Sequence, residues 1–341
     1  MSTRAPAVQA RQLIKTYPGE VTALSGMDLT VEAGTVFGLL GPNGAGKSTT
    51  VKILTTLARP DSGTATVAGH DVLRDPDRVR RVIGVVAQRS GADPVATGRE
   101  NLRLQGRLHG LRGAALRPRV DGLLDRFQLG DAADRQVRGY SGGMRRRLDV
   151  ALGLVHRPEV LFLDEPTTGL DPEARTAMWE EIARLAGDEG LTILLTTHYL
   201  DEADRLADRI AIVDRGRVVV QGTAGALKGE LRGDAVHLEL RAPVGEAGRT
   251  LLGGALTALP GVYEAHFDGR RVSVRAEDGA AAVPVLLGTL ERAGVGVAAA
   301  TVARPSLDDV YLRYAGRRYA EAEAAASAGP ADALAAAGGA R

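Results

Sequence analysis

The sequence predicts two domains. A larger α/β domain, built on a parallel sheet with an antiparallel β flank and a helical insert, precedes a small α+β domain. Three observations support this prediction. A glycine-rich loop at 41–48 separates an apolar strand from a helix, short apolar runs recur at Val160–Leu163 and Thr192–Thr196, and the C-terminal part follows the order β-α-β-β-α-β. The 341 residues suffice for two domains, each with its own core.

Composition is typical of a globular protein and excludes several kinds of site. Hydrophobic residues make up 44% of the chain and charged residues 25%. The net charge of +1 argues against a dedicated nucleic-acid surface, and the lack of cysteine excludes disulfides and thiolate metal sites. The chain shows no apolar run of about 18 residues and no apolar leader, so we expect a soluble, cytosolic protein.

Residues 41–48 have the sequence GPNGAGKS, which matches the GxxxxGK[ST] pattern of a phosphate-binding loop. Glycines let the backbone pass close to phosphates and point consecutive N–H groups at them. Lys47 supplies a cation for the β- and γ-phosphates, and Ser48 a hydroxyl for Mg²⁺. The apolar run Thr35–Leu40 and the helical spacing of Thr49–Leu57 provide the required order of strand, loop and helix. This context disfavours the alternative of a chance glycine-rich turn.

Turn residues and apolar spacing predict the other elements of the larger domain. Ala7–Tyr17 and Val21–Val31 alternate on either side of a Pro-Gly turn, which is typical of a hairpin. Gly63–Val67 and Val82–Val86 are predicted strands, and the Leu/Arg-rich segment Thr97–Leu129 has the spacing of a helical insert.

A buried strand ends in two carboxylates, Asp164 and Glu165, at the edge where open α/β sheets place ligands. We expect Asp164 to hold Mg²⁺ directly or through water. We expect Glu165 to polarise the attacking water, as a general base or a positioning group. The alternative is an acidic helix cap, which Pro166-Thr167 would allow, but a phosphate loop in the same chain favours the first interpretation.

The segment Tyr140–Met144 (YSGGM) resembles the signature motif of ATP-binding-cassette (ABC) ATPases, usually LSGGQ. It precedes the acidic strand end at the distance that this family requires. Taken singly, an aromatic, an amide or a histidine would more often be structural, but order and spacing favour the functional interpretation. The matching motifs, over about residues 7–225, are the adenine-stacking Tyr17, Walker A at Gly41–Thr49, the Q-loop Gln88, Walker B with Asp164 and Glu165, the D-loop Asp171 and the switch His198.

The resemblance implies a P-loop NTPase fold of the ABC type and an enzyme that hydrolyses ATP with Mg²⁺. It implies that Lys47, Glu165 and His198 are catalytic. The implied metal-site residues are Ser48, Gln88 and Asp164. The implied nucleotide-contacting residues are Tyr17, Gly41, Pro42, Asn43, Gly44, Ala45, Gly46, Lys47, Ser48, Thr49, Gln88, Ser141, Gly142, Gly143 and Asp171.

In this family the signature motif grips the γ-phosphate bound to the other subunit. The resemblance therefore implies that the chain pairs head to tail with a second copy of itself, with Ser141 of one chain facing Lys47 of the other. Ser141 and the following glycines precede a predicted helix, Met144–Val155, and offer it a hydroxyl and unhindered N–H groups. Asp171 would reach across the interface, and His198 would sense the γ-phosphate.

Tyr140 and Met144 depart from the consensus Leu and Gln. Neither position supplies the backbone contacts, so we expect activity to survive. The run MRRRL (144–148) resembles a subfamily that includes the daunorubicin-resistance ATPases. This resemblance implies export of hydrophobic drugs or natural products through a separate ABC-2 type permease, at the cytoplasmic face of the membrane. Two alternatives are an ABC-type clamp on nucleic acid or ribosomes, which usually carries two cassettes, and a non-hydrolysing regulatory cassette, which the intact Lys47, Glu165 and His198 argue against.

The C-terminal part has the ferredoxin-like order of elements. The predicted strands and helices are Ala235–Arg241, Gly248–Leu259, Val262–Phe267, Arg271–Arg275, Ala280–Ala293 and Val295–Ala303. The following segment, Pro305–Tyr314, resembles the "PSLDDVFL" helix of the same subfamily. A stabilising appendage and a dimerisation or regulatory module remain open as roles.

Composition shifts predict the domain boundaries. We expect a nucleotide-binding domain at 1–230, with a helical subdomain at about 89–157, and a ferredoxin-like domain at 231–316. The Ala-rich sequence at 317–341 has almost no large apolar residue to dock it, so we expect a mobile tail.

Overall fold

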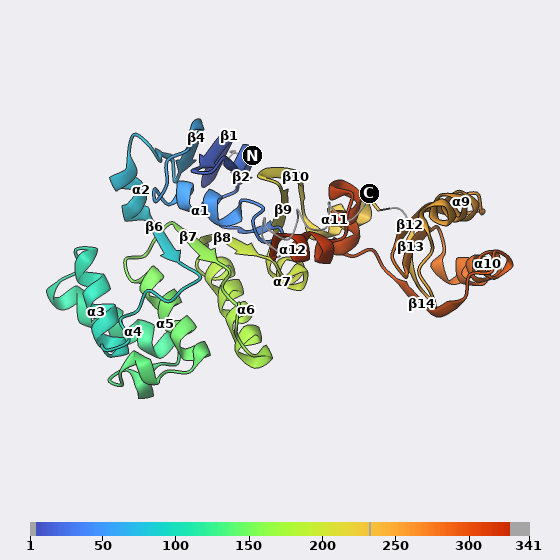
Figure 1. Cartoon of the computed structure of the whole chain (residues 1–341). Helices are drawn as coiled ribbons and strands as arrows, with labels where there is room; N and C mark the ends of the chain where they lie inside the picture. Colours follow the sequence, from blue (N-terminus) through green and yellow to red (C-terminus); the bar gives the residue numbers. More distant parts are fainter. Residues whose placement is uncertain (1–4, 232, 328–341) are drawn as a thin grey trace. The chain divides into compact units, whose positions relative to one another are not determined.

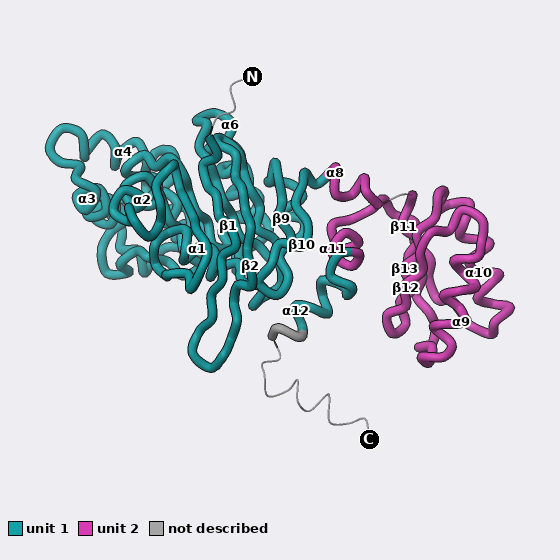
Figure 2. The backbone as a smooth tube through the Cα atoms, turned by 90° about the horizontal axis from the view of Figure 1, so that it is seen from above, with its two compact units in different colours: residues 1–224, 314–341 teal, residues 225–313 magenta. Residues whose placement is uncertain are grey.

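The computed structural model describes residues 5–231 and 233–327, which form two compact units (Figure 2). Unit 1 contains the chain up to Ala224 and again from Tyr314 onward. Unit 2 is Gly225–Arg313. The expected boundary at residue 230 therefore lies a few residues beyond the division between the units, after helix α8 (Ala224–Gly229).

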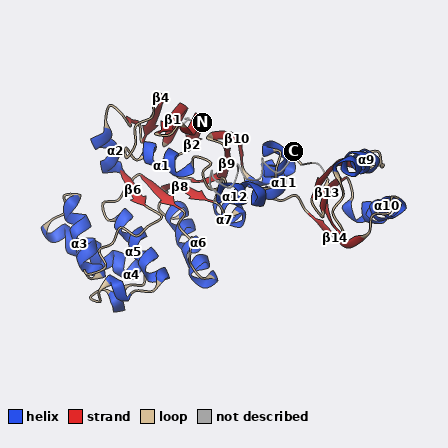
Figure 3. Ribbon diagram, in the orientation of Figure 1, coloured by secondary structure: helices blue, strands red, loops and turns tan. Residues whose placement is uncertain are grey.

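The centre of unit 1 is a sheet with the strand order β10-β9-β3-β8-β7-β6, drawn in red in Figure 3. All neighbouring pairs are parallel except β10 with β9, which form an antiparallel edge. The central strands are buried along almost their whole length, as a sheet covered on both faces requires. The strands are β3 (Val36–Leu40), β6 (Ile83–Val86), β7 (Val160–Asp164), β8 (Thr192–Thr197), β9 (Arg209–Asp214) and β10 (Arg217–Gly222).

An antiparallel sheet with the order β2-β1-β4-β5 flanks the parallel one. The predicted hairpin is confirmed, because β1 and β2 pair antiparallel from Val8 opposite Val31 to Tyr17 opposite Val21. Helix α1 contacts β2, β4 and β7, so it lies between the two sheets, whereas α6 and α7 lie on the other side of the parallel sheet (Figure 1). The strands are β1 (Val8–Tyr17), β2 (Val21–Val31), β4 (Ser62–Val67) and β5 (His70–Asp71). The helices are α1 (Lys47–Leu54), α2 (Pro76–Val82), α6 (Pro172–Gly187) and α7 (Leu200–Leu206).

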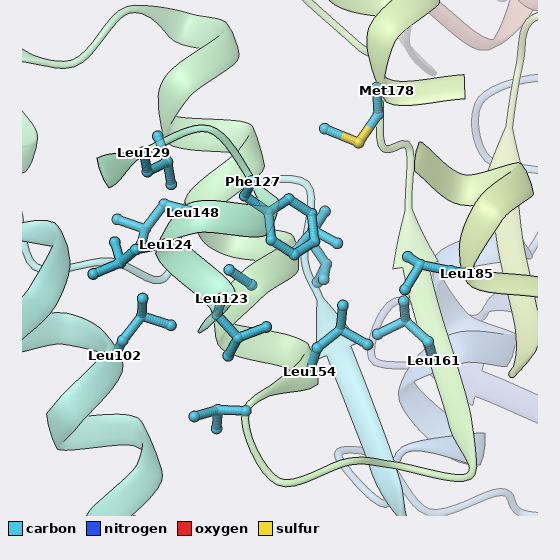
Figure 4. Close-up of a cluster of buried hydrophobic side chains, with 14 of the residues drawn as sticks. Leu102, Leu123, Leu124, Phe127, Leu129, Leu148, Leu154, Leu161, Met178 and Leu185 are labelled. Carbon is cyan, nitrogen blue, oxygen red and sulfur yellow. The ribbon is translucent and has the colours of Figure 1, made fainter. Parts of the chain in front are cut away.

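The predicted helical insert is present as α3 (Gly98–Leu108), α4 (Leu116–Arg126) and α5 (Gly142–Leu154). Thr97 and Glu100 form a capping box that fixes the start of α3. Apolar side chains from these helices meet those of α6 and β7 in one cluster, which includes Phe127 and Leu161 (Figure 4). This shared core means that α5 is packed directly against the parallel sheet.

A polar chain connects α6 and α7 inside unit 1. Glu202 of α7 is fully buried. Its Oε1 accepts hydrogen bonds from Thr167 Oγ1 at 2.7 Å and from Trp179 Nε1 of α6 at 3.0 Å. Thr167 follows the acidic end of β7, so this chain joins that end to two helices. Among the described residues, no helix combines the length and apolar character needed to cross a bilayer.

Unit 2 has the predicted order of elements, β-α-β-β-α-β, and its antiparallel sheet has the strand order β12-β13-β11-β14. Helix α9 contacts β12, and α10 contacts β11, β13 and β14. Their apolar side chains form a core with the sheet around Leu238 and Leu256. The elements are β11 (Asp234–Leu240), α9 (Glu246–Thr257), β12 (Val262–Asp268), β13 (Arg271–Ala276), α10 (Gly279–Arg292) and β14 (Val297–Ala303).

The segment after β14 forms the expected helix, α11 (Leu307–Ala315), in which Asp309 pairs with Arg275 of β13 at 3.3 Å. The following segment corrects the expectation of an undocked tail. Helix α12 (Tyr319–Ser327) belongs to unit 1, and Tyr319 and Ala322 are only 4% and 2% exposed. Just before it, Arg317 donates to Asp214 Oδ1 of β9 at 2.8 Å. The remainder of the predicted tail, 328–341, lies outside the described residues.

Candidate nucleotide site

The glycine-rich loop connects β3 to α1, in the predicted order. Two of its glycines are required by close packing. A Cβ at Gly41 would lie 2.5 Å from the carbonyl oxygen of Val213, and one at Gly46 would lie 2.7 Å from that of Ala23. Gly46 also has a φ of +109°, which favours glycine. The loop is therefore held against β2 and β9 just before the start of α1.

Lys47 is buried at the base of this loop, where 4% of it is exposed. Its Nζ donates hydrogen bonds to the carbonyl oxygens of Gly41 at 2.6 Å and Pro42 at 3.1 Å. The same atom lies 4.0 Å from Glu165 Oε1. Burial lowers the pKa of Lys47, and the neighbouring Glu165 and Asp164 carboxylates oppose that shift. The amine is thus directed at the site by backbone carbonyls and one carboxylate.

Asp164 ends β7 directly opposite Thr196 of β8 in the parallel register. Its Oδ1 accepts a hydrogen bond from Thr196 Oγ1 at 2.6 Å and another from Ser48 Oγ at 3.3 Å. Parallel strands bring their carboxyl ends to one edge of the sheet, and this edge faces the start of α1. The predicted hydroxyl and carboxylate of the metal site therefore lie side by side.

Glu165 lies at the centre of the site and has an unusual backbone. Its φ is +49°, in the left-handed region, and its N–H donates to the carbonyl oxygen of Thr196 at 3.1 Å. The residue is 8% exposed. A non-glycine residue in this conformation carries strain of about 1–3 kcal/mol, which surrounding contacts must hold.

Four groups from different elements converge on the Glu165 carboxylate. Gln88 Nε2 donates to Oε2 at 3.0 Å, and Thr168 Oγ1 donates to the same atom at 3.2 Å. His198 Nδ1 lies 3.2 Å from Oε1, on the same side as Lys47. His198, and after it Lys47, hold the pKa of Glu165 below its ordinary value, against the opposing effect of burial. The carboxylate is therefore kept ionised.

Other predicted site residues lie apart from this cluster. Ser141 caps α5, and its Oγ accepts from Met144 N at 3.2 Å. Asp171 caps α6, and its Oδ1 accepts from Ala174 N at 2.8 Å. Across the described part of the chain, no hydrogen bond or ion pair joins Ser141–Gly143 to the phosphate loop. Tyr17 lies at the end of β1, where Lys15 Nζ is 5.5 Å from the centre of its ring.

The structure adds three residues that the sequence analysis did not single out. Thr196 and Thr168 bond to the two carboxylates, and Arg146 of α5 bonds to the backbone on both sides of Glu165. The sequence could have indicated that Arg146 is buried, because it lies four residues before Val150 on a predicted helix and so shares the apolar face of that helix. Thr196 and Thr168 carried no signal of their own, since threonine is common at strand ends and turns.

Comparisons with known proteins give the family and its relatives. The sequence model of the family described as "ABC transporter" matches residues 24–168. The chain is 49% identical over 306 residues to the daunorubicin resistance ATP-binding protein DrrA3 of Streptomyces coeruleorubidus, covering 89% of this chain and 95% of that protein. It is 43% identical over 316 residues to the doxorubicin resistance ATP-binding protein DrrA of Mycobacterium tuberculosis, covering 90% of this chain and 92% of the relative.

Solved structures show the same fold for unit 1. The cbiO1 protein of Clostridium perfringens, part of the ABC transporter complex cbiONQ, matches with a TM-score of 0.62 and 27% identity, covering 67% of this chain and 92% of its own. A dimeric ATP-binding cassette in a post-hydrolysis state bound to ADP and Pi matches with a TM-score of 0.58 and 27% identity, over 63% of this chain and 98% of that one. The chain therefore belongs to the ABC transporter family, as an ATP-binding subunit that hydrolyses ATP.

Proposed function

We propose that this chain powers the efflux of hydrophobic drugs or natural products through a separate membrane permease of the ABC-2 type. The observation that supports hydrolysis is the convergence of Lys47, Gln88 and His198 on the ionised Glu165. The support for drug export is the near full-length similarity to daunorubicin and doxorubicin resistance proteins. The proposed site of action is the cytoplasmic face of the membrane, where the permease would hold the chain.

The phosphate loop and the end of β7 fit MgATP. The backbone of Gly41–Gly46 would cradle the phosphates, and Lys47 would exchange its carbonyl contacts for phosphate oxygens. Ser48 Oγ and Asp164 Oδ1 form a hard oxygen pair 3.3 Å apart, which suits Mg²⁺, and Gln88 is the third proposed member. Bound Mg²⁺ would neutralise charge on the β- and γ-phosphates.

Glu165 and His198 would act on the attacking water and the γ-phosphate. The Glu165 carboxylate stays ionised, so it can accept a proton from water or hold that water in line. His198 is placed beside Oε1 by the end of β8 and would sense the γ-phosphate. Gln88 would report the state of the site to the helical insert, which begins a few residues later.

A second copy of the chain would complete each site. Ser141, Gly142 and Gly143 sit at the start of α5, where N–H groups attract anions, and they make no bond to their own phosphate loop within the described residues. We propose that they grip the γ-phosphate bound to the partner, with Asp171 across the interface. Tyr17 would stack on the adenine. No role in nucleic-acid binding is proposed.

Co-expression with a candidate ABC-2 permease in a drug-sensitive host tests the proposal. Wild type should raise daunorubicin resistance and lower cellular drug content, and Glu165→Gln should do neither at equal expression. Resistance that requires both proteins and fails with the variant supports coupled efflux. Drug content unchanged by the wild-type pair, despite ATPase activity in isolated membranes, would contradict the proposed cargo. Tight nucleotide-dependent binding to RNA instead would favour the clamp alternative.

A further inference from the structure

Arg146, six residues after the start of the signature motif, is buried, and each of its three guanidinium nitrogens donates to a backbone carbonyl. It is 7% exposed. Its Nε donates to the carbonyl oxygen of Pro166 at 2.7 Å, and Nη2 donates to that of Asp164 at 3.1 Å. Nη1 donates to the carbonyl oxygen of Ala87 at 2.6 Å. One side chain on α5 thus bonds to the segment at the end of β7 and to the segment that carries Ala87. Hydrogen bonds from a charged donor are stronger than those from a neutral one.

Two of these bonds bracket Glu165. The carbonyls of Asp164 and Pro166 flank the residue whose φ is +49°, and one guanidinium spans both. A planar guanidinium has a fixed fork of donors, so it holds two carbonyls at a defined separation. That separation depends on the backbone torsions of Glu165. The arginine is therefore placed to stabilise the left-handed conformation from outside.

The same helix face also holds the loop that carries Gln88. Arg146 bonds to Ala87, directly before Gln88. Asp149, three residues along α5, accepts hydrogen bonds through Oδ1 from Ser90 Oγ at 2.8 Å and from Gly91 N at 3.2 Å. The loop is thus attached to α5 on both sides of Gln88, whose amide bonds to the Glu165 carboxylate.

We propose that Arg146 is a positioning residue for ATP hydrolysis, which holds Glu165 in its left-handed conformation and, together with Asp149, ties the Gln88 loop to the helix that starts at the signature motif. Through this brace, a movement of α5 is passed to Glu165 and Gln88 together. The inference rests on the role proposed above for Glu165 as the group that acts on water.

The test compares ATPase kinetics of the full-length chain for wild type, Arg146→Met, Arg146→Lys and Glu165→Gln. Arg146→Met should lower kcat about 10- to 100-fold, because a small displacement of a catalytic group has that effect. The KM for ATP and the calorimetric Kd of MgATP should change less than about threefold, since the phosphate loop is untouched. Arg146→Lys, which keeps the charge but not the fork, should give an intermediate kcat.

Arg119→Met is the matched control. Arg119 of α4 also donates to two backbone carbonyls, those of Leu154 and Val155, but these lie at the far end of α5 from the signature motif. Its loss should lower the melting temperature while leaving kcat within about twofold. Hydrogen exchange in the nucleotide-free chain gives a second readout. Arg146→Met should speed exchange at residues 87–91 and 164–168, and Arg119→Met should not.

Coupling decides whether Arg146 acts through Glu165. The double variant Arg146→Met/Glu165→Gln should hydrolyse ATP no more slowly than Glu165→Gln alone. A wild-type kcat for Arg146→Met overturns the inference, as does an equal loss of kcat in Arg119→Met. If Arg146→Met does not fold, the kcat of Arg146→Lys decides instead. A reduced kcat supports the inference, and a wild-type kcat contradicts it. A wild-type rate for Glu165→Gln would instead overturn the proposed role of Glu165 itself.

Discussion

Glu165 combines a strained backbone with a carboxylate that contacts residues from several elements. Gln88, Thr168 and His198 reach it from three different segments of unit 1. The identities of Glu165, Gln88 and His198 could be predicted from motif order. The positive φ and the Arg146 bonds could not, because both depend on where α5 meets the end of β7, and no local pattern encodes that meeting.

Replacing Glu165 by Gln should separate ATP binding from hydrolysis. The amide keeps the shape and loses the charge that aligns and deprotonates water, so kcat should fall about 10²- to 10⁴-fold while ATP still binds. An ATP-bound dimer should then accumulate, visible by size-exclusion chromatography with MgATP. A variant that remains monomeric, or hydrolyses at the wild-type rate, would contradict the role given to Glu165.

The lowered pKa of Glu165 makes a pH-dependent contribution to stability. A carboxylate whose folded pKa lies below its ordinary 4.5 stabilises the fold above that pH, and this contribution is lost as the pH falls through the lower folded value. His198→Ala removes the largest cause of the shift, so the stability lost on acidification should be smaller in the variant. Thermal melts from about pH 3 to 7 check this. Identical curves for wild type and His198→Ala would count against it.

At the scale of elements, the sequence predicted the strands and helices that carry a strong apolar period, and it missed the docking of α12. Its segment is dominated by Ala and Glu, so its apolar pattern is faint. Burial there depends on one large side chain, Tyr319, and on a close approach at Ala322. Arg317 adds a bond to β9 that only the folded arrangement of unit 1 reveals.

Tyr319→Ala should therefore destabilise unit 1. Removing a buried aromatic ring from a packed site costs about 3–5 kcal/mol of unfolding free energy, with the lower end expected for a helix near the chain terminus. Urea unfolding followed by circular dichroism measures the change. Ala320→Ser is a suitable control, because Ala320 is exposed on the same helix. Equal stability of wild type and Tyr319→Ala would show that α12 does not dock in solution.

At the scale of the whole molecule, unit 2 is inserted between two parts of unit 1, because the chain returns to unit 1 from Tyr314 onward. Composition shifts predicted a second folded module. They did not predict that the C-terminal segment packs on unit 1, because a contact between distant segments produces no pattern in the local sequence. The order of elements within each unit could be predicted from the sequence, because the apolar residues of each strand or helix recur with the period of that element. Because unit 1 includes the segment from Tyr314 onward, a deletion that tests unit 2 alone has to keep that segment.

Deleting the chain after residue 230 removes all but the first residues of unit 2, together with the returning segment. We expect the 1–230 fragment to bind ATP with little change in Kd, because the phosphate loop and Asp164 remain, but to melt at a lower temperature. Joining residues 1–230 to 314–341 through a flexible Gly/Ser linker should restore the melting temperature. If the joined chain also confers full drug resistance with the permease, unit 2 is an appendage with no role in transport. Lost resistance with intact ATP binding would support a dimerisation or regulatory role.

The hydrogen bond between Trp179 and Glu202 makes Trp179 an intrinsic fluorescence probe of this region. The sequence contains a single tryptophan, so intrinsic indole emission comes from one place. That indole N–H shares a carboxylate oxygen with Thr167, two residues from Glu165. Any rearrangement of the Glu165 loop that moves Thr167 alters the polar surroundings of the indole, and with them the wavelength of its emission. Changes at the catalytic loop can thus be followed by fluorescence in the unlabelled protein.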